Sequence, residues 1–329
     1  MVLADLQGRL AALRTQLCPP QIYMQIQDQA ITGMALEGRQ VRWLERLPLP
    51  EGVCRHGVPL LPVALGDLLG DWLLERGYGG AQVKAVLPPS ACSWRVLEQP
   101  PGLNSDGLQT WAEGMAEQLG LVWAEGGCAQ DLDLLCEPLA NGQEQVLLVT
   151  VARVLLEGWF DVMEQAGCGL AALQPACLCG WNALVPLRIA SAPVLEMLGL
   201  FLVGHQQSWL SLLAFHHPVG QWCLPGVEGM DGVLDCVRFL MRSAVGAALG
   251  GASSERQALL LVADGAEPEL IQAWLTTLSE VLTCEVRLVD PLQMGWLQWA
   301  ETSQMGSGTA GVPWLLWGLA APDLQASSP

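Results

Sequence analysis

Eleven cysteines are the residues with the most obvious potential for chemistry in this sequence. Pairs spaced as in Cys-x-x-Cys would bind zinc, and an exported chain would use such residues in disulfides. The closest pair, Cys177 and Cys179, is separated by a single residue, and no histidine pair stands at ligand spacing beside it. We therefore expect no metal site and interpret the thiols as reduced, small apolar core residues.

Two further motifs are candidates for a reactive site. His216 and His217 are adjacent, but neighbouring residues of a strand point to opposite faces, so a solvated turn explains them better than joint metal binding. Ser307–Gly311 is rich in glycine but lacks the lysine and the spacing of a P-loop, which favours a connector. We predict no catalytic residue from either motif.

Fourteen tryptophans are present, and several lie on apolar stripes. Four of them cluster near the C-terminus at helical spacing: Trp296, Trp299, Trp314 and Trp317. We interpret this cluster as core, with a partner surface as the alternative, because tryptophan is enriched at interface hot spots.

The charge balance excludes some partners. Lys and Arg total 15 and Asp and Glu total 33, which gives a net charge of −18. Such a surface repels nucleic-acid phosphates and anionic lipids, whereas a basic partner segment remains compatible. The most apolar window, Val194–Phe215, contains Glu196 and several polar residues, so it predicts buried strands and no membrane insertion.

The first residues carry a leucine stripe with helical spacing. Its members are Leu3, Leu6, Leu10, Leu13 and Leu17. Asp5 and two arginines interrupt the apolar run, so it lacks the continuous core of a secretory signal peptide. We interpret residues 1–20 as a leader helix or a disordered segment.

Apolar periodicity predicts the elements that would position a site. Strands are expected within 21–47 and at 82–87, 92–97, 146–151, 194–203, 209–215, 221–225, 258–263 and 285–289. Helices are expected at 62–76, 108–119, 155–165, 233–249, 267–282 and 313–319. The order repeats once along the chain, which predicts two α/β units in tandem with a boundary between Ala183 and Pro193.

Four stretches resemble the PilM family of type IV pilus assembly proteins, within the actin-like ATPase superfamily. Tyr23–Pro50 stands in the place of the family's opening hairpin. Val83–Pro101 is similar to the strand and the Arg-x-Leu-x-x-Pro that lead into an inserted subdomain. Asp131–Leu184 is similar to the family's acidic strand, its apolar strand and the helix after them, which ends in an Ala-Gly turn. Ala258–Pro291 is similar to the adenosine motif. The resemblance covers Tyr23 to Leu319.

The resemblance implies an α/β, two-lobed actin-like ATPase (ribonuclease H-like) fold with an inserted subdomain in lobe I. Lobe I would comprise residues 21–187, with the insertion at about 88–145. Lobe II would comprise residues 188–329.

The resemblance also implies where a nucleotide would lie. Members of the superfamily wrap the phosphates in two turns, each with an Asp that positions hydrated Mg²⁺. In this chain Gln25 and Leu202 occupy the two Asp positions, Gln27 replaces a glycine, and Asp28 stands one place later. The predicted nucleotide-site positions are Gln25, Gln27, Asp28, Gly204, His205, Gln206, Asp264, Gly265 and Ala266.

Without the two aspartates, charge compensation for a triphosphate is missing. We therefore expect no catalytic residue, no bound metal and at most weak ATP–Mg²⁺ binding. An active actin-like ATPase of pilus assembly is the alternative, and a GspL-like secretion component is another.

PilM-like proteins capture the N-terminal tail of the membrane protein PilN, which implies a PilN-like partner here. The implied groove lies beside the insertion, with Val83, Leu87, Trp94, Val96 and Val149 as its predicted residues. The expected role is a cytoplasmic scaffold in a pilus or competence machine, peripheral at the inner membrane through its partner.

Overall fold

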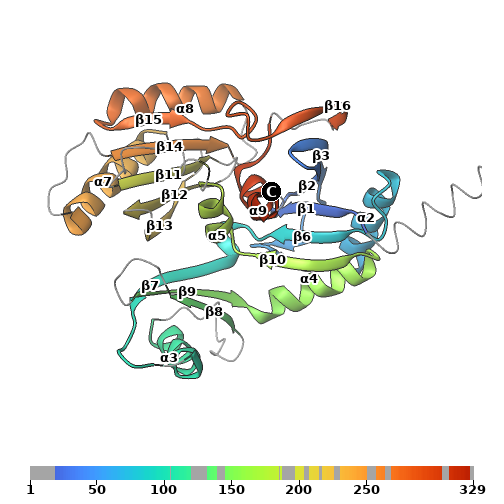
Figure 1. Cartoon of the computed structure of the whole chain (residues 1–329), viewed down its shortest axis with the longest axis horizontal. Coiled ribbons are helices and arrows are strands. Elements are labelled where there is room, and N and C mark those ends of the chain that lie inside the picture. Colours follow the sequence, from blue (N-terminus) through green and yellow to red (C-terminus); the bar gives the residue numbers. More distant parts are fainter. Residues whose placement is uncertain are drawn as a thin grey trace, which may run out of the picture.

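The computed structural model shows two lobes and a small additional sheet beside the first lobe (Figure 1). It describes residues 19–103, 105–119, 132–138, 145–184, 186, 197–203, 207–214, 217–225, 230–249, 257–263, 268–305 and 311–326. Apart from two prolines, the predicted leader at residues 1–20 lies outside the described residues.

Lobe I is built on a six-stranded sheet with the order β10-β6-β1-β2-β3-β16. β1 and β2 are antiparallel, as are β2 and β3, while β6 and β10 run parallel to β1. Met24 of β1 therefore lies between Gly33 of β2 and Ala85 of β6. The strands are β1 (Gln21–Ile26), β2 (Ala30–Glu37), β3 (Gln40–Pro48), β6 (Gln82–Val86), β10 (Gly169–Gln174) and β16 (Gln298–Met305).

Lobe II has a five-stranded sheet with the order β13-β12-β11-β14-β15. In sequence order these strands correspond to β3-β2-β1-β6-β10 of lobe I. The repeated order confirms the two α/β units expected from the sequence. Helices α7 (Met230–Leu249) and α8 (Pro268–Val281) pack on one face, where Trp274 meets Phe201 edge-on at 5.3 Å. The strands are β11 (Met197–Val203), β12 (Gln207–Ala214), β13 (His217–Pro225), β14 (Gln257–Ala263) and β15 (Glu285–Leu288).

The inserted subdomain is a three-stranded sheet with one helix. Its strands follow the order β7 (Cys92–Glu98), β9 (Gln145–Ala152) and β8 (Leu132–Pro138), and its helix is α3 (Ser105–Gln118). The expected C-terminal boundary near residue 145 needs correction, because residues 145–151 of β9 pair with β7, from Glu98↔Gln145 to Cys92↔Val151, and Ala152 pairs with Leu132 of β8. The insertion therefore extends to about Ala152.

The C-terminal segment returns to lobe I, which corrects the expected extent of lobe II. β16 joins the lobe I sheet beside β3, and helix α9 (Trp314–Ala326) packs on β1 and β6. Residues 314–321 of α9 are all buried, so this stretch needs apolar neighbours on every side. The short helix α5 (Ala176–Asn182) provides one such neighbour, and both helices lie between the two sheets (Figure 1).

One continuous core joins the lobes around α5 and α9. It contains Tyr23 and Val86 of lobe I together with Leu200 and Leu260 of lobe II. The indoles of Trp314 and Trp317 are buried and donate hydrogen bonds to the carbonyls of Gly180 and Ala183 at 3.3 and 3.2 Å. The interpretation of these two tryptophans as core is therefore confirmed.

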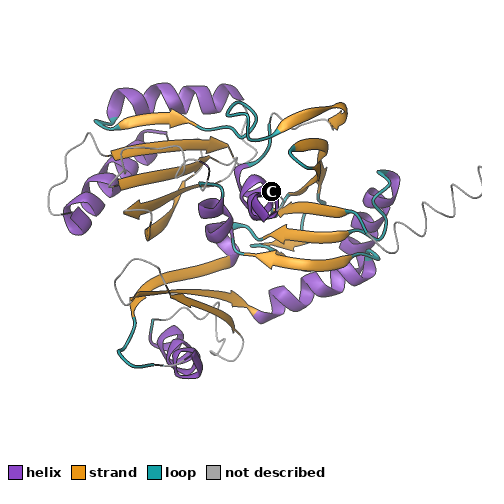
Figure 2. Cartoon of the chain, in the orientation of Figure 1, coloured by secondary structure: helices purple, strands orange, loops and turns teal. Residues whose placement is uncertain are grey.

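Helices α2 (Pro62–Glu75) and α4 (Arg153–Gln165) cover the other face of the lobe I sheet (Figure 2). They approach closely where α2 has Gly66, since a Cβ there would lie 2.5 Å from that of Gln165. A small hairpin of β4 (Cys54–Arg55) and β5 (Val58–Pro59) precedes α2. None of the helices within the described ranges is both long and apolar enough to cross a membrane.

Candidate functional site

The turn between β1 and β2 contains the first three predicted nucleotide-site residues. Gln25 is 1% exposed and lies between Thr32 of β2 and Val86 of β6 in the sheet. Gln27 and Asp28 are half-buried, and the Gln27 amide donates to the Ala30 carbonyl at 2.9 Å to close the turn. A neutral, buried amide therefore stands where the resemblance requires a metal-positioning carboxylate.

Asp28 is the acidic residue nearest to that position, and its carboxylate binds backbone amides. The amides of His56 and Gly57 donate to its two oxygens at 2.8 and 2.9 Å. Hydrogen bonds to an ionised acceptor are about twice as strong as neutral ones. Asp28 therefore serves as an anchor for the β4–β5 turn.

The turn between β4 and β5 has a backbone conformation that the Asp28 carboxylate helps to hold. His56 and Gly57 have φ values of 50° and 77°, and a two-residue hairpin turn of this kind requires positive φ at both positions. The indole of Trp159 on α4 donates to the Gly57 carbonyl at 2.7 Å from a buried position. Together, Asp28 and Trp159 hold the turn between the sheet and α4.

The second lobe presents a related arrangement. Leu202 is the penultimate residue of β11, as Gln25 is of β1, and its side chain is buried in the core between the lobes. A leucine side chain has no oxygen with which to hold hydrated Mg²⁺. The other predicted nucleotide-site residues, Gly204, His205, Gln206, Asp264, Gly265 and Ala266, lie outside the described residues.

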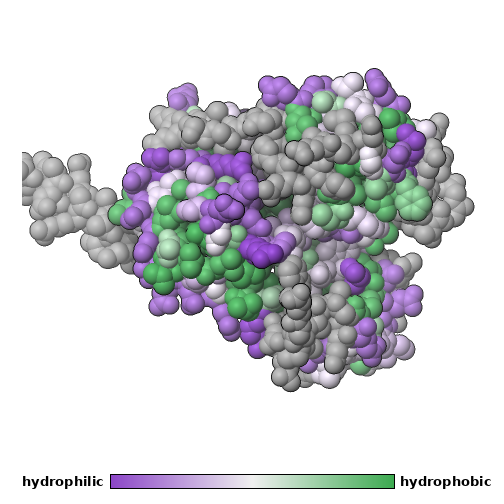
Figure 3. Space-filling view, turned by 180° about the vertical axis from the view of Figure 1, so that it is seen from behind, coloured by the Kyte–Doolittle hydropathy of each residue, from purple (hydrophilic) through white to green (hydrophobic). Residues whose placement is uncertain are grey.

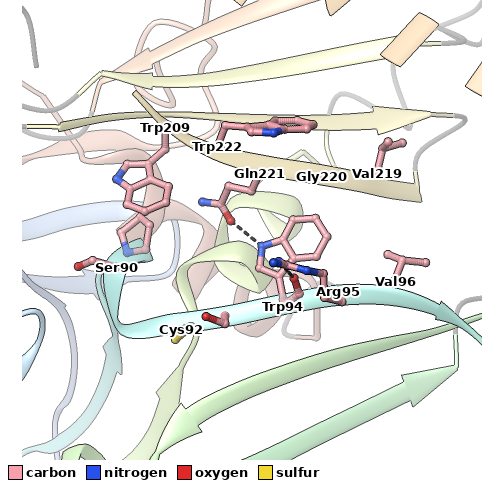
Figure 4. Close-up of a pocket in the computed structure, with 12 residues that line it drawn as sticks. Ser90, Cys92, Trp94, Arg95, Val96, Trp209, Val219, Gly220, Gln221 and Trp222 are labelled. Atoms are coloured by element: carbon pink, nitrogen blue, oxygen red, sulfur yellow. Dashed lines mark hydrogen bonds between the residues drawn. The ribbon is translucent and has the colours of Figure 1, made fainter. Parts of the chain in front are cut away.

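A separate cleft opens between the inserted subdomain and lobe II, with a volume of about 530 Å³. β7 forms one wall, and β12 and β13 form the other (Figure 4). The Trp94 indole crosses between the walls and donates to the Gln221 side-chain oxygen at 2.6 Å. Trp94 also packs edge-on against Trp181 of α5 at 5.2 Å, which fixes the wall relative to the interlobe core.

The structure brings together only part of the predicted partner groove. Trp94 and Val96 line the cleft, and Val149 lies under it, buried opposite Trp94 in the sheet. Val83 and Leu87 need correction, because both side chains are 0% exposed inside the lobe I core and cannot touch a partner.

Sequence reasoning missed the lobe II wall, which contributes Trp209, Val219 and Gln221. These residues follow Trp94 by more than a hundred positions, and no spacing rule predicts that β13 comes beside β7. The only signal was compositional, since tryptophans on strands beside polar residues are candidates for an interface.

The lining of this cleft suits an extended apolar chain. Its walls carry Trp94, Trp209 and Trp222, and the only charged side chain among its lining residues is Arg95. The Arg95 guanidinium donates to the Trp94 carbonyl at 2.8 Å, on β7, which is an edge strand among the described residues. Edge strands add peptides as further strands, and apolar pockets then select their side chains.

The thiols agree only in part with the expectation of a buried core role. Cys54, Cys168, Cys177 and Cys179 are buried, whereas Cys223 and Cys236 are exposed. Burial raises the pKa of Cys92, at the edge of the cleft, to about 12, which keeps this thiol protonated near neutral pH. In the described part of the chain no three His, Cys, Asp or Glu side chains lie together as metal ligands would.

Comparison with known proteins adds information on the fold. No family model matches the sequence, and no curated protein matches it. A solved PilM–PilN type IV pilus biogenesis complex is similar over 94% of this chain and 99% of that chain, with a TM-score of 0.66 and 17% identity. A Bacteroides thetaiotaomicron protein with an actin-like ATPase fold and unknown function covers 84% of this chain and 93% of its own, with a TM-score of 0.53 and 8% identity.

A third solved structure is the cytoplasmic domain of EpsL, an inner membrane component of the type II secretion system of Vibrio cholerae. It matches 94% of this chain and 95% of its own length with a TM-score of 0.47 and 13% identity. The doubled strand order, the insertion after β6 and the first of these likenesses agree with one another. The chain therefore has the actin-like ATPase fold, in a divergent form that resembles the PilM of a type IV pilus biogenesis complex over nearly its whole length.

Proposed function

We propose that the chain is a PilM-like scaffold that binds the N-terminal tail of a PilN-like membrane protein in the cleft between β7 and β13. The observation that supports this proposal is the cleft itself. It lies beside the inserted subdomain, is lined by three tryptophans and is bounded by an edge strand. A similar solved complex is named for PilM and PilN together.

The chemistry of the cleft fits such a tail. An extended segment donates and accepts backbone hydrogen bonds along β7, while its apolar side chains fill the space between the indoles. The bond from Trp94 to Gln221 joins the two walls, so the cleft is formed before the tail arrives. Preformed sites bind more tightly because less ordering accompanies association.

A peptide titration tests this role. The probe is a synthetic N-terminal tail of a PilN-like membrane protein, and calorimetry measures its affinity for the full chain. Val219→Glu places a charge in the cleft at a side chain that is 41% exposed, and we expect it to weaken binding at least tenfold.

The matched control is Phe239→Glu, at a 68% exposed side chain on α7 that does not line the cleft. It should leave the affinity unchanged. Absence of binding to the unmodified chain, or equal affinity of the Val219→Glu variant, would refute the proposed role.

We further propose that the interlobe nucleotide site is degenerate. This proposal is supported by the buried amide of Gln25, the buried Leu202 and the engagement of the Asp28 carboxylate by two amides. Titration of the full chain with ATP and Mg²⁺ should give no saturable heat at micromolar concentrations. Micromolar binding, together with phosphate release, would instead support an active ATPase.

In this proposal the chain works at the cytoplasmic face of the inner membrane and is held there by its partner. Fractionation of cells that contain or lack the PilN-like protein tests this location. The chain should move from the membrane fraction to the cytosol when the partner is deleted.

A further inference from the structure

Lobe I exposes apolar side chains on its outer face, at the N-terminal ends of α2 and α4. Leu61, Val63 and Val154 are 54%, 64% and 63% exposed, and Leu74 at the other end of α2 is 69% exposed. Figure 3, which views the molecule from behind, shows a broad hydrophobic area on this lobe. Exposed apolar surface bordered by polar residues is a candidate interaction site.

The two helices form a groove because they run side by side in the same direction. Pro59 lies against Gly158, and four to seven residues later Gly66 lies against Val162 and Gln165. The Gln165 side chain donates to the Asp67 carboxylate at 2.7 Å across the line of contact. Helices this close leave a shallow groove between their outward faces, into which side chains of a third helix can pack.

Acidic side chains border this groove on both sides. On α2 they are Asp67, Asp71 and Glu75, and on α4 they are Glu157, Asp161 and Glu164, all exposed. An occupant should therefore combine an apolar stripe with basic residues beside it.

We propose that residues 1–17 of this same chain dock on the α2–α4 groove as a third helix. Their leucines, at positions 3, 6, 10, 13 and 17, alternate in steps of three and four, which is the pattern of a helix that packs along one narrow seam. Arg9 immediately precedes Leu10, and Arg14 immediately follows Leu13, so the two arginines flank the seam on opposite sides. Each arginine then faces the acidic border of one helix.

The place where the described chain begins allows this docking. The Pro20 carbonyl accepts a hydrogen bond from the Gln82 amide at 2.9 Å, and the Ala81 carbonyl accepts one from the Gly169 amide at 3.0 Å. Gly169 follows the last residue of α4 by four positions, so the chain enters the sheet near the C-terminal ends of both helices. Pro19 and Pro20 cannot continue a helix, which permits a reversal there.

The lengths also match. A helix from Leu3 to Leu17 is about 21 Å long at about 1.5 Å per residue. α2 contains 14 residues, which gives it nearly the same length. Leu17 would lie near Leu74, and the first leucines would reach the apolar surface at Leu61 and Val63.

Trypsin provides a direct test because Arg9 and Arg14 are themselves cleavage sites. Limited digestion of the full chain, followed by intact mass, measures how fast residues 1–9 and 1–14 are released. Docking should slow this release at least tenfold relative to a synthetic peptide of residues 1–18. Val63→Glu in the groove, or Leu10→Glu in the leucine seam, should restore the rate of the free peptide.

Matched controls place the same charge elsewhere on the same two helices. Ala64→Glu lies one residue along α2, about 100° around its axis, and Ala12→Glu lies on the side of the leader away from the leucines. Both should keep the slow release. Release from the unmodified chain at the rate of the free peptide would overturn the proposal. So would protection that disappears on dilution together with a dimer mass in light scattering, since a second copy would then cover the groove.

Discussion

Gly318 lies where α9 touches the backbone of α5. A Cβ at this position would overlap the Cys179 carbonyl oxygen and lie 2.6 Å from the carbonyl carbon. Both atoms belong to the backbone of a buried helix, so neither can move without shifting α5. The close approach is what lets Trp314 and Trp317 reach the carbonyls of Gly180 and Ala183.

Gly318→Ala should therefore destabilise the chain by about 3 kcal/mol, at the upper end of the cost of overpacking a core. Urea denaturation of the variant measures this loss. Gly114→Ala is the matched control, since a Cβ on this helical glycine of α3 meets nothing within 4 Å. It should stabilise by about 0.5 kcal/mol or more, because glycine is a poor helix former. Equal stability of the two variants would contradict the packing of α9 described above.

At the level of elements, α9 is tied to the sheet by one polar cluster. The Lys84 amine of β6 donates to both Asp323 oxygens at 2.6 and 2.7 Å, and the Tyr23 hydroxyl of β1 donates to one of them at 2.9 Å. Burial alone would raise the pKa of Asp323, but the hydrogen bonds from Lys84, Tyr23 and Gln21 outweigh it and lower this pKa. Burial raises the pKa of the Tyr23 hydroxyl, and the hydrogen bond to Asp323 raises it further. The hydroxyl therefore stays protonated and can donate.

The sign of the pH dependence follows from the lowered pKa of Asp323. The cluster contributes stability above the ordinary Asp pKa of about 3.9 and loses it as the pH falls through the folded-state value. Lys84→Met should cost about 1 kcal/mol at neutral pH, since the pair is partly exposed, and should flatten the loss of stability below about pH 4. Unfolding midpoints measured across this range check the prediction, with Arg287→Met of the exposed Glu285 pair as the control. An unchanged acid limb in Lys84→Met would argue against the cluster.

The elements also show what the sequence can and cannot predict. Periodicity located α2, whose buried residues Leu65, Leu69 and Trp72 follow helical spacing, and the apolar runs of β9 and β14. It missed β16, which is polar and is a strand only because β3 offers it an open edge. It also missed α5, which has seven residues and is too short to display a period.

Only some residues of the candidate site were predicted correctly, because the sequence does not show which distant elements come together. Trp94 and Val96 were found because the resemblance placed them beside the insertion, and Gln25 and Asp28 because the resemblance aligned the turn after β1 with a phosphate-binding turn. Val83 and Leu87 were assigned to the partner groove, but both are buried in the core. The sequence of an apolar strand does not distinguish a strand that lines a groove from one inside a core. The role of Asp28 depends on two amides 28 and 29 residues away, and only the tertiary structure brings these together.

The whole molecule is held together by a core that crosses the lobe boundary. Because residues of both sheets pack on α5 and α9 in one cluster, neither lobe can open its interior without exposing that of the other. We therefore expect the lobes to unfold together in a single urea transition. Superimposable curves from tryptophan fluorescence and far-ultraviolet circular dichroism would show this. Two separated transitions would show that the interlobe core is weaker than its extent indicates.

Lys84 is the only lysine of the chain, and its amine is held by Asp323. Reagents that acylate primary amines will therefore modify Lys84 more slowly in the native protein than in the unfolded chain. Acylation of Lys84 itself will report the moment at which α9 leaves the sheet.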